Sequence, residues 1–249
     1  MHIVTSSRIF LFLSTIFFTA LLSSTASAYI FGPPNITEII GVGESQSSFG
    51  FFSRAESDVF SGTKNEVNTV GLAGGIKTGD QSGSINFQYR LSKATLSSTT
   101  LERTQTDFGL GLGSEWNLLS ERNLGLFANF QVDFGTAEFT KGSSNTAALS
   151  TLGGEIGGYY RFFIETATIA PFILINQFKT KNQVSVAFDT DFTLTNSGRT
   201  TMYGIVFNFR NVSLSYTQSS TNSQRSSDAS SFVLNRSDTG SFLSLGFIF

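Results

Sequence analysis

The sequence predicts an all-β protein, namely a transmembrane antiparallel up-and-down β-barrel of about ten strands, with eight strands as the alternative. Apolar and polar residues alternate with a period of two along much of the chain, as strands with two unlike faces require. The connections between these segments are alternately short and long, which is typical of such barrels. Charged residues make up only 14% of the chain, against about 25% in soluble domains. A soluble surface with so few charges would be unusual.

The first 28 residues are predicted to be a signal peptide that is cleaved after Ala28. Arg8 precedes an apolar stretch at 9–22, and small residues follow it, as in secretory signals. That stretch is shorter than the roughly 20 apolar residues of a spanning helix, and no later stretch approaches this length. Any crossing of a membrane must therefore use strands.

Four segments of the mature chain show the clearest alternation. In the first of them, every second residue from Ile85 to Leu91 is apolar and the residues between them are polar or charged. Each segment has the length of a tilted membrane-spanning strand, which needs roughly 9 to 11 residues. The four segments lie at 84–92, 108–118, 124–134 and 152–162.

Six weaker segments bring the number of expected strands to ten. One of them contains Pro171, which has no N–H group, so we expect that strand to begin later or to carry a bulge. The same segment is apolar on both faces through Phe172 and Leu174, which leaves its register open. The six segments lie at 47–54, 70–78, 169–178, 202–209, 212–217 and 240–249.

The connections between these segments fall into two alternating classes. This alternation predicts that all short turns lie at one end of the barrel and all long loops at the other. The longest polar connection, at 219–237, is dominated by serine and is expected to be a mobile, exposed loop. The short connections are 79–83, 120–123, 165–168 and 210–211, and the long ones are 55–66, 97–103, 141–147, 184–199 and 219–237.

The alternation alone does not decide which face of the strands points outward. A soluble, secreted, lipocalin-like binding barrel, apolar inside and polar outside, would have the same period. The scarcity of charge and the length of the strands favour the membrane alternative, in which the apolar face meets lipid.

The last strand ends with alternate apolar residues and a terminal aromatic residue: Leu243, Leu245, Phe247 and Phe249. This pattern resembles the C-terminal signal of bacterial outer-membrane proteins. The resemblance implies a small Gram-negative outer-membrane β-barrel of the porin-like class. It also implies outer-membrane lipid and the barrel-assembly machinery as partners.

The mature chain is expected to have two parts in this setting. Residues 29–42 contain Pro33 and Pro34 but no convincing strand, so we expect a periplasmic N-terminal segment or a short plug inside the lumen. Residues 43–249 are expected to form the barrel.

The composition argues against an enzyme. The chain has no cysteine, and its one histidine, His2, leaves with the signal peptide. The usual activation of a nucleophile needs an imidazole or a thiolate, and outer-membrane barrel enzymes resemble one another in relying on a histidine. We therefore expect no enzymatic activity, no metal and no cofactor. The formal net charge of −2 also gives no reason to expect nucleic acid as a partner.

Parity along the strands assigns six charged residues to the lumen, three of each sign. Counting residues from the short turns places Lys77, Glu115 and Arg161 in a low layer and Arg90, Asp133 and Glu155 near mid-height. We expect opposite charges to pair within each layer, because buried charges are usually paired. Such a network would either fill and close a narrow barrel or form a charged constriction in a small pore. The six residues are Lys77, Arg90, Glu115, Asp133, Glu155 and Arg161.

The sequence thus favours a non-enzymatic barrel with an envelope-structural or narrow, porin-like permeation role. Two alternatives remain at this point: a surface adhesin or ligand-recognition barrel that acts through its outer loops, and the soluble lipocalin-like barrel. The partner of the outer loops is not predicted.

Overall fold

The computed structural model describes residues 45–60, 63–78, 83–96, 102–119, 123–140, 145–185, 192–228 and 233–249. The expected signal peptide and the expected segment 29–42 lie outside these ranges. Within them the chain forms a single antiparallel sheet of 11 strands and contains no helix. None of the described residues therefore belongs to a helix that could cross a membrane.

Ten strands are long, and one, β7, has three residues. They are β1 (Ser45–Phe60), β2 (Thr63–Thr78), β3 (Gly83–Leu96), β4 (Glu102–Asn117), β5 (Leu124–Thr140), β6 (Asn145–Tyr160), β7 (Phe162–Ile164), β8 (Ala167–Ser185), β9 (Phe192–Phe209), β10 (Val212–Ser227) and β11 (Val233–Ile248).

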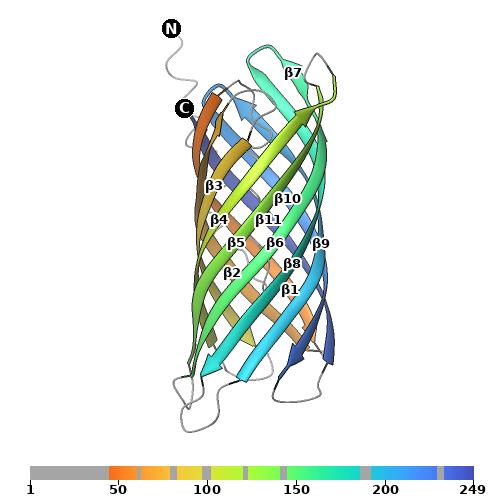
Figure 1. Cartoon of the computed structure of the whole chain (residues 1–249). Coiled ribbons are helices and arrows are strands. Elements are labelled where there is room, and N and C mark those ends of the chain that lie inside the picture. Colours follow the sequence, from red (N-terminus) through yellow and green to blue (C-terminus); the bar gives the residue numbers. More distant parts are fainter. Residues whose placement is uncertain are drawn as a thin grey trace.

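The sheet closes on itself to form a barrel with tilted strands (Figure 1). Each long strand pairs with the next one along the chain, and β1 pairs with β11, for example Phe51 with Leu245. Closure satisfies the backbone donors and acceptors that an open edge would leave unpaired. The predicted up-and-down barrel of ten long strands is confirmed.

The barrel has two distinct ends. One, which we call the turn end, carries the close connections between β6 and β8 and between β9 and β10, together with Ser45 and Phe249 (Figure 1). Ser47 and Phe249 exchange two backbone hydrogen bonds there, of 3.1 and 2.8 Å. The opposite end, which we call the loop end, is where β8 ends and β9 begins.

Three of the expected long loops, 55–66, 184–199 and 219–237, are wrong over most of their length, because the strands continue into them, whereas 97–103 and 141–147 lie mostly outside the described residues. β10 runs to Ser227 and β11 starts at Val233, so the expected mobile loop 219–237 is mostly paired sheet. The extension of β10, from Ser219 to Ser227, is polar on both faces. It therefore lacks the alternation by which strands are recognised in a sequence. Other extensions contribute to a small buried apolar cluster, in which Ala147 and Val184 lie and against which Phe192 packs.

Pro171 lies inside β8, and the expected bulge or later start is wrong. Instead, the pairing of β8 with β6 stops at Tyr159 and resumes with β7 at Phe162 in the same register. Arg161 donates its N–H to Asn123 on the other side, so the backbone of Tyr160 faces β8, opposite Pro171. Because Pro171 has no N–H group, the ladder is interrupted at this point.

The exterior of the barrel has an apolar band at the turn end and a polar region at the loop end. On β5 the outward residues are almost all apolar from Leu124 to Phe134, and on β8 they are apolar from Ile169 to Ile175. We call the polar region beyond the band the collar. The apolar face of the alternating strands thus lies outside, which is the reverse of a lipocalin-like barrel.

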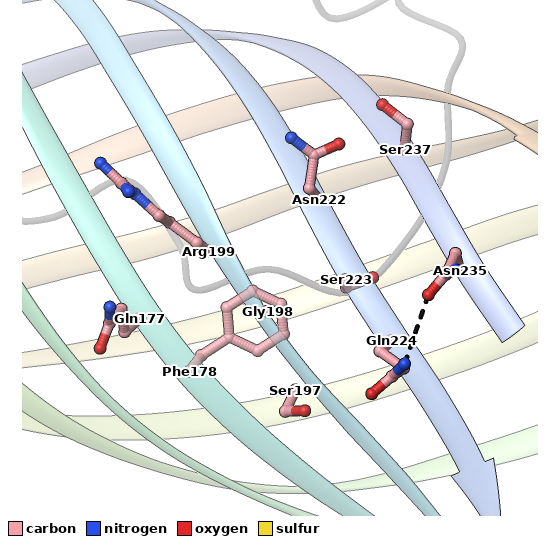
Figure 2. Close-up of a pocket in the computed structure, with 10 residues that line it drawn as sticks. All are labelled: Gln177, Phe178, Ser197, Gly198, Arg199, Asn222, Ser223, Gln224, Asn235 and Ser237. Carbon is pink, nitrogen blue, oxygen red and sulfur yellow. Dashed lines mark hydrogen bonds between the residues drawn. The ribbon is translucent and has the colours of Figure 1, made fainter. Parts of the chain in front are cut away.

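Two open depressions mark this exterior where band and collar meet. One, of about 850 Å³, lies mainly in the apolar band over β4, β5, β6 and β8. The other, of about 910 Å³, lies in the collar over β8 to β11 and is lined by polar residues such as Arg199 and Asn222 (Figure 2). Gln177 and Phe178 line both.

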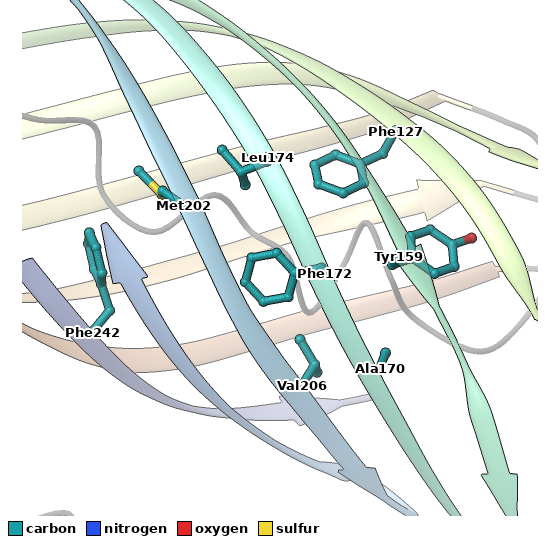
Figure 3. Packing of buried hydrophobic residues seen from close by; sticks show 8 residues of the cluster. All are labelled: Phe127, Tyr159, Ala170, Phe172, Leu174, Met202, Val206 and Phe242. Carbon is teal, nitrogen blue, oxygen red and sulfur yellow. The ribbon is translucent and has the colours of Figure 1, made fainter. Parts of the chain in front are cut away.

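The interior of the barrel is filled on two sides by different kinds of residues. Polar and charged side chains dominate the inner face of β3 to β6, whereas β10 contributes mainly serine and threonine. Between them lies an apolar cluster that includes Phe172, Met202 and Phe242 (Figure 3). These inward apolar residues explain why β8 is apolar on both faces.

Candidate functional site

The candidate site is the polar side of the lumen, and a row of glycines on β4 makes its geometry possible. Gly109, Gly111 and Gly113 all lie on the inner face of β4. A Cβ atom at Gly109 would overlap Asp133 Oδ1, and one at Gly111 would overlap Asn86 Oδ1. The side chains of β3 and β5 therefore meet above β4, across a strip of bare backbone.

The layer nearest the loop end is an ion-paired group around Arg90 on β3. Arg90 Nη2 lies 3.0 Å from Asp133 Oδ2, and Arg90 Nε lies 3.7 Å from Asp107 Oδ2. Asp133 Oδ1 also accepts hydrogen bonds from Gln88, at 3.2 Å, and from Gln131, at 2.7 Å. Two carboxylates and two amides thus surround one buried guanidinium group.

The middle layer is a chain of amides that ends at a carboxylate. Asn86 Nδ2 donates to Asn129 Oδ1 at 3.1 Å, and Asn129 Nδ2 donates to Glu155 Oε1 at 2.8 Å. Asn176 Nδ2 lies 3.5 Å from Glu155 Oε2. This layer joins β3, β5, β6 and β8, so it covers about half of the lumen wall.

The layer at the turn end is built on Glu115 and Arg161. Arg161 Nη2 forms an ion pair with Glu115 Oε1, which also accepts a hydrogen bond from Tyr159. The guanidinium group of Arg161 lies 4.5 Å from the ring centre of Tyr159, and Tyr159 Oη is 3.2 Å from Asn117 Oδ1. The Tyr159 ring lies above Gly125, where a Cβ would overlap it.

The apolar cluster occupies the lumen beside these layers. Its members are buried, and they come from β5, β6, β8, β9 and β11 (Figure 3). In the order of the sheet, β5 and β11 stand on opposite sides of the ring. From β1, the guanidinium carbon of Arg54 lies 4.3 Å from the ring centre of Phe242. The cluster contains Phe127, Tyr159, Ala170, Phe172, Leu174, Met202, Val206 and Phe242.

The remaining wall carries small hydroxyl side chains. Thr200 on β9 and Thr221 on β10 are hydrogen bonded at 2.9 Å, and Ser215 on β10 bonds to Ser244 on β11. Short side chains on β10 leave room for the bulky cluster on the strands beside it.

The structure places five of the six expected lumen residues on the inner face, in three layers. Arg90 pairs with Asp133 and Arg161 pairs with Glu115. Glu155 does not join the layer of Asp133, because the register sets Thr151 opposite Asp133; its partners are amides. Lys77 pairs with Ser84 along the backbone of β2 and β3, and its side chain lies outside the described part of the structure.

The sequence analysis missed three members of the site. Asp107 lies one residue before the segment recognised as a strand, and Arg54 lies in the weakest segment. Tyr159 is on the inner face, where an aromatic residue is easily taken for a lipid-facing one. A parity count over the full strands finds Asp107 and Tyr159, because each lies an even number of residues from an assigned lumen residue, Glu115 and Arg161 respectively. No lumen residue was assigned on the strand of Arg54, so parity had no reference there.

The carboxylates of the lumen are engaged in separate networks. Glu115, Asp133 and Glu155 each accept hydrogen bonds from different partners. Among the described residues, no group of three or more His, Cys, Asp or Glu side chains could hold a metal ion. Asp133 and Glu115 are paired with cations and Glu155 is held by amides, which suits filling of the lumen or an electrostatic constriction.

The C-terminal residues lie on the outer face of the closing strand. Leu243, Leu245 and Phe247 are half-buried on β11, and Phe249 is exposed beyond its end. Their function as an assembly signal remains an expectation from the sequence.

No family model and no curated protein matches the chain. The β domain of the Bordetella autotransporter BrkA is similar in fold, with 11% identity, 83% of this chain and 99% of that chain covered, and a TM-score of 0.48. The transport unit of the autotransporter AIDA-I from Escherichia coli has 12% identity, coverages of 92% and 96%, and a TM-score of 0.44. The outer membrane protease OmpT from Escherichia coli has 11% identity, coverages of 82% and 95%, and a TM-score of 0.42. These likenesses concern the fold alone, so no role is taken from them.

Proposed function

We propose that the chain is an integral outer-membrane β-barrel whose lumen is closed by its own side chains and whose role is envelope-structural. The exterior supports the membrane location. Large apolar side chains such as Ile85, Leu112 and Ile156 are more than half exposed. A soluble protein rarely exposes a contiguous apolar patch of more than a few hundred Å², whereas this band surrounds the barrel.

The height of the band fits an outer membrane. On β5 the band extends over 11 residues, from Leu124 to Phe134. At a rise of about 3.4 Å per residue and a tilt of about 40°, these residues rise about 25 Å. The apolar band of outer-membrane barrels is also about 25 Å tall.

The two ends of the barrel support an orientation. Outer-membrane barrels have short turns on the periplasmic side and longer connections outside. We therefore assign the turn end, with Phe249, to the periplasm and the collar to the cell surface.

The filled lumen is the observation that carries the proposed role. The ion pairs of Arg90 and Arg161, the amides around Glu155 and the apolar cluster are all buried. A barrel of about eight strands is just filled by side chains, and one of ten strands is only slightly wider. Bulky residues such as Phe127 and Phe172 take up that additional width, so we expect no open pathway for solutes.

Bilayer conductance tests this role directly. The refolded mature protein should give no conductance steps in a planar bilayer. A variant with Phe127→Ala, Phe172→Ala and Phe242→Ala should give steps, because it removes the bulk of the cluster. A gel-mobility shift on boiling must show that this variant is a folded barrel. A wild-type protein that conducts would contradict the closed lumen.

Narrow permeation along the polar wall is the second candidate. It is favoured by the three polar layers around Glu115, Glu155 and Asp133, which follow one another along the same side of the lumen. If this wall conducts, the wild-type protein will show small steps, and Asp133→Asn will change their cation selectivity. In a closed barrel the same variant will change stability only.

A further inference from the structure

A basic patch lies on the exterior of β8 and β9, just beyond the apolar band. Lys179 and Lys181 on β8 and Arg199 on β9 are all exposed on the outer face. Among the residues that the structure describes, none of the three takes part in an ion pair. Their backbone neighbours on β6 and β10, such as Leu152 and Asn222, carry no charge. Within the described ranges, the patch therefore presents three positive charges without an ion-pair partner.

The two exterior depressions meet beside this patch. The apolar depression lies on the turn-end side of the patch and is lined by residues such as Phe130, Leu152 and Ile175. It reaches Lys179 on its loop-end side. The polar depression contains Arg199 and Asn222, whose side chains project from neighbouring strands (Figure 2). Both are lined by Gln177, so they adjoin at this residue, and together they form an exterior groove with an apolar and a polar part.

A glycine on the outer face of β6 helps to hollow the apolar part of the groove. The register places Gly154 between Phe130 on β5 and Gln177 on β8, and Gln177 pairs in turn with Arg199 on β9. A Cβ atom at Gly154 would meet nothing nearer than Asn129 O, at 3.9 Å. The groove floor is therefore backbone, with room for a hydrocarbon chain.

We propose that this groove binds a phosphorylated glycolipid of the outer leaflet, with an acyl chain over Gly154 and a phosphate group between Lys179, Lys181 and Arg199. The proposal rests on the membrane location and orientation proposed above, which place the patch at the level of the lipid headgroups. Charge complementarity selects this occupant: a zwitterionic lipid would fill the groove but leave the three cations uncompensated. Asn222 and Gln224 offer amide groups to the hydroxyl groups of the sugar.

Binding of bisphosphorylated lipid A to the refolded protein in detergent tests the charge complementarity. The variant Lys179→Gln, Lys181→Gln, Arg199→Gln should weaken binding by at least about tenfold, since each cation near an anionic lipid surface contributes separately. Dephosphorylated lipid A should bind the wild-type protein about tenfold more weakly as well. The control is Lys93→Gln, which removes an exposed cation from the outer face of β3 and should leave affinity unchanged.

A second pair of variants tests the apolar part of the groove without changing the charge. Gly154→Leu fills the groove floor. It should weaken the binding of lipid A by at least about tenfold, because several methylene groups of the acyl chain can no longer be buried there. Gly158→Leu adds the same side chain to the outer face of β6 nearer the turn end, outside the groove. It should bind lipid A like the wild type.

The outcomes separate this proposal from the proposed membrane location. A protein that shifts on boiling and fractionates with outer membranes, but binds both forms of lipid A equally or is unaffected by the triple variant, overturns the lipid site alone. A protein that stays soluble without a mobility shift overturns both. The losses with the triple variant and with Gly154→Leu, together with unchanged binding by both controls, support the site.

Discussion

Asp133 Oδ2 lies 3.0 Å from Arg90 Nη2, although β4 runs between the strands that carry these two residues. The pair forms across Gly109, whose missing side chain leaves the space that Asp133 occupies. Hydrogen bonds in this lumen therefore connect strands that are second neighbours in the sheet. The glycines of β4 are as much a part of the network as its charged residues.

The close approach at Gly109 predicts a cost for any side chain there. Gly109→Ala should lower the free energy of unfolding by about 1 to 3 kcal/mol, because the new methyl group overlaps Asp133 Oδ1. Urea unfolding of the refolded barrel in detergent, followed by tryptophan fluorescence, measures this change. Gly154→Ala is the control, because its Cβ would have no atom nearer than 3.9 Å. An equal effect in both variants would contradict the explanation.

A double-mutant cycle should connect this cost to the carboxylate. In the background of Asp133→Ala the closest overlap disappears and only the 2.9 Å contacts with the flexible side chains of Gln131 and Gln88 remain, so Gly109→Ala should cost clearly less than it does in the wild type. Additive effects of the two substitutions would mean that the glycine is required for another reason. The same unfolding measurement provides all four values.

The turn-end ion pair predicts a large penalty for removing one partner. Glu115→Gln leaves the buried guanidinium group of Arg161 without its carboxylate and should cost about 3 kcal/mol of unfolding free energy. Adding Arg161→Gln should recover part of that loss, because no isolated charge remains. Glu138→Gln, on the exposed outer face of β5, is the control and should change stability little. If Glu115→Gln behaves like Glu138→Gln, the pair is not buried as the structure describes.

The single tryptophan reports on the membrane location. Trp116 is exposed on the outer face of β4, within the apolar band. In vesicles its fluorescence should be quenched by lipids brominated on their acyl chains and protected from iodide in the water. The variant Trp116→Phe, Thr104→Trp moves the reporter along β4 into the collar, where the opposite result is expected. Strong iodide quenching of Trp116 would contradict the lipid-facing band.

The interruption of the ladder at Pro171 predicts a gain on its replacement. Pro171→Ala introduces an N–H group opposite Tyr160, whose backbone faces β8. The amide at position 171 should then be protected from hydrogen exchange to a degree similar to its neighbours in β8. Rapid exchange at this position would show that the gap between β6 and β7 has another cause.

The strand count, the outward face and the short turns at 165–166 and 210–211 could be predicted from the sequence because lipid imposes a simple pattern. Ile85, Phe87 and Tyr89 face outward, and the polar residues between them face the lumen. The difference between these two environments produces the alternation in the sequence. The strand ends could not be predicted, because neither face of the collar needs to be apolar. The expected strand ended at residue 178, so Lys179 and Lys181 were left outside it, whereas they lie within the 19-residue strand β8.

The lumen residues were assigned by parity, and counting from the short turns grouped Arg90 with Asp133 and Arg161 with Glu115, which the structure pairs; the place of Glu155 was not predicted. Parity gives the face of a residue and says nothing about its height relative to another strand, which depends on register. Glu155 was expected beside Arg90, yet the register sets it nearer the turn end, where amides surround it. The hydrogen bond from Asn86 to Asn129 across Gly111 could not be predicted either. A glycine in a strand equally suggests curvature of the strand.

The collar changes how the surface of such a protein can vary. β8, β9 and β10 remain paired well beyond the apolar band, so each connection at the loop end starts from hydrogen-bonded backbone that stands in water. Insertions or deletions in these connections leave the pairing inside the lipid untouched. The sequence of the apolar band is thus constrained by the membrane. The connections at the loop end can change in sequence while the collar holds them at a fixed distance from the membrane.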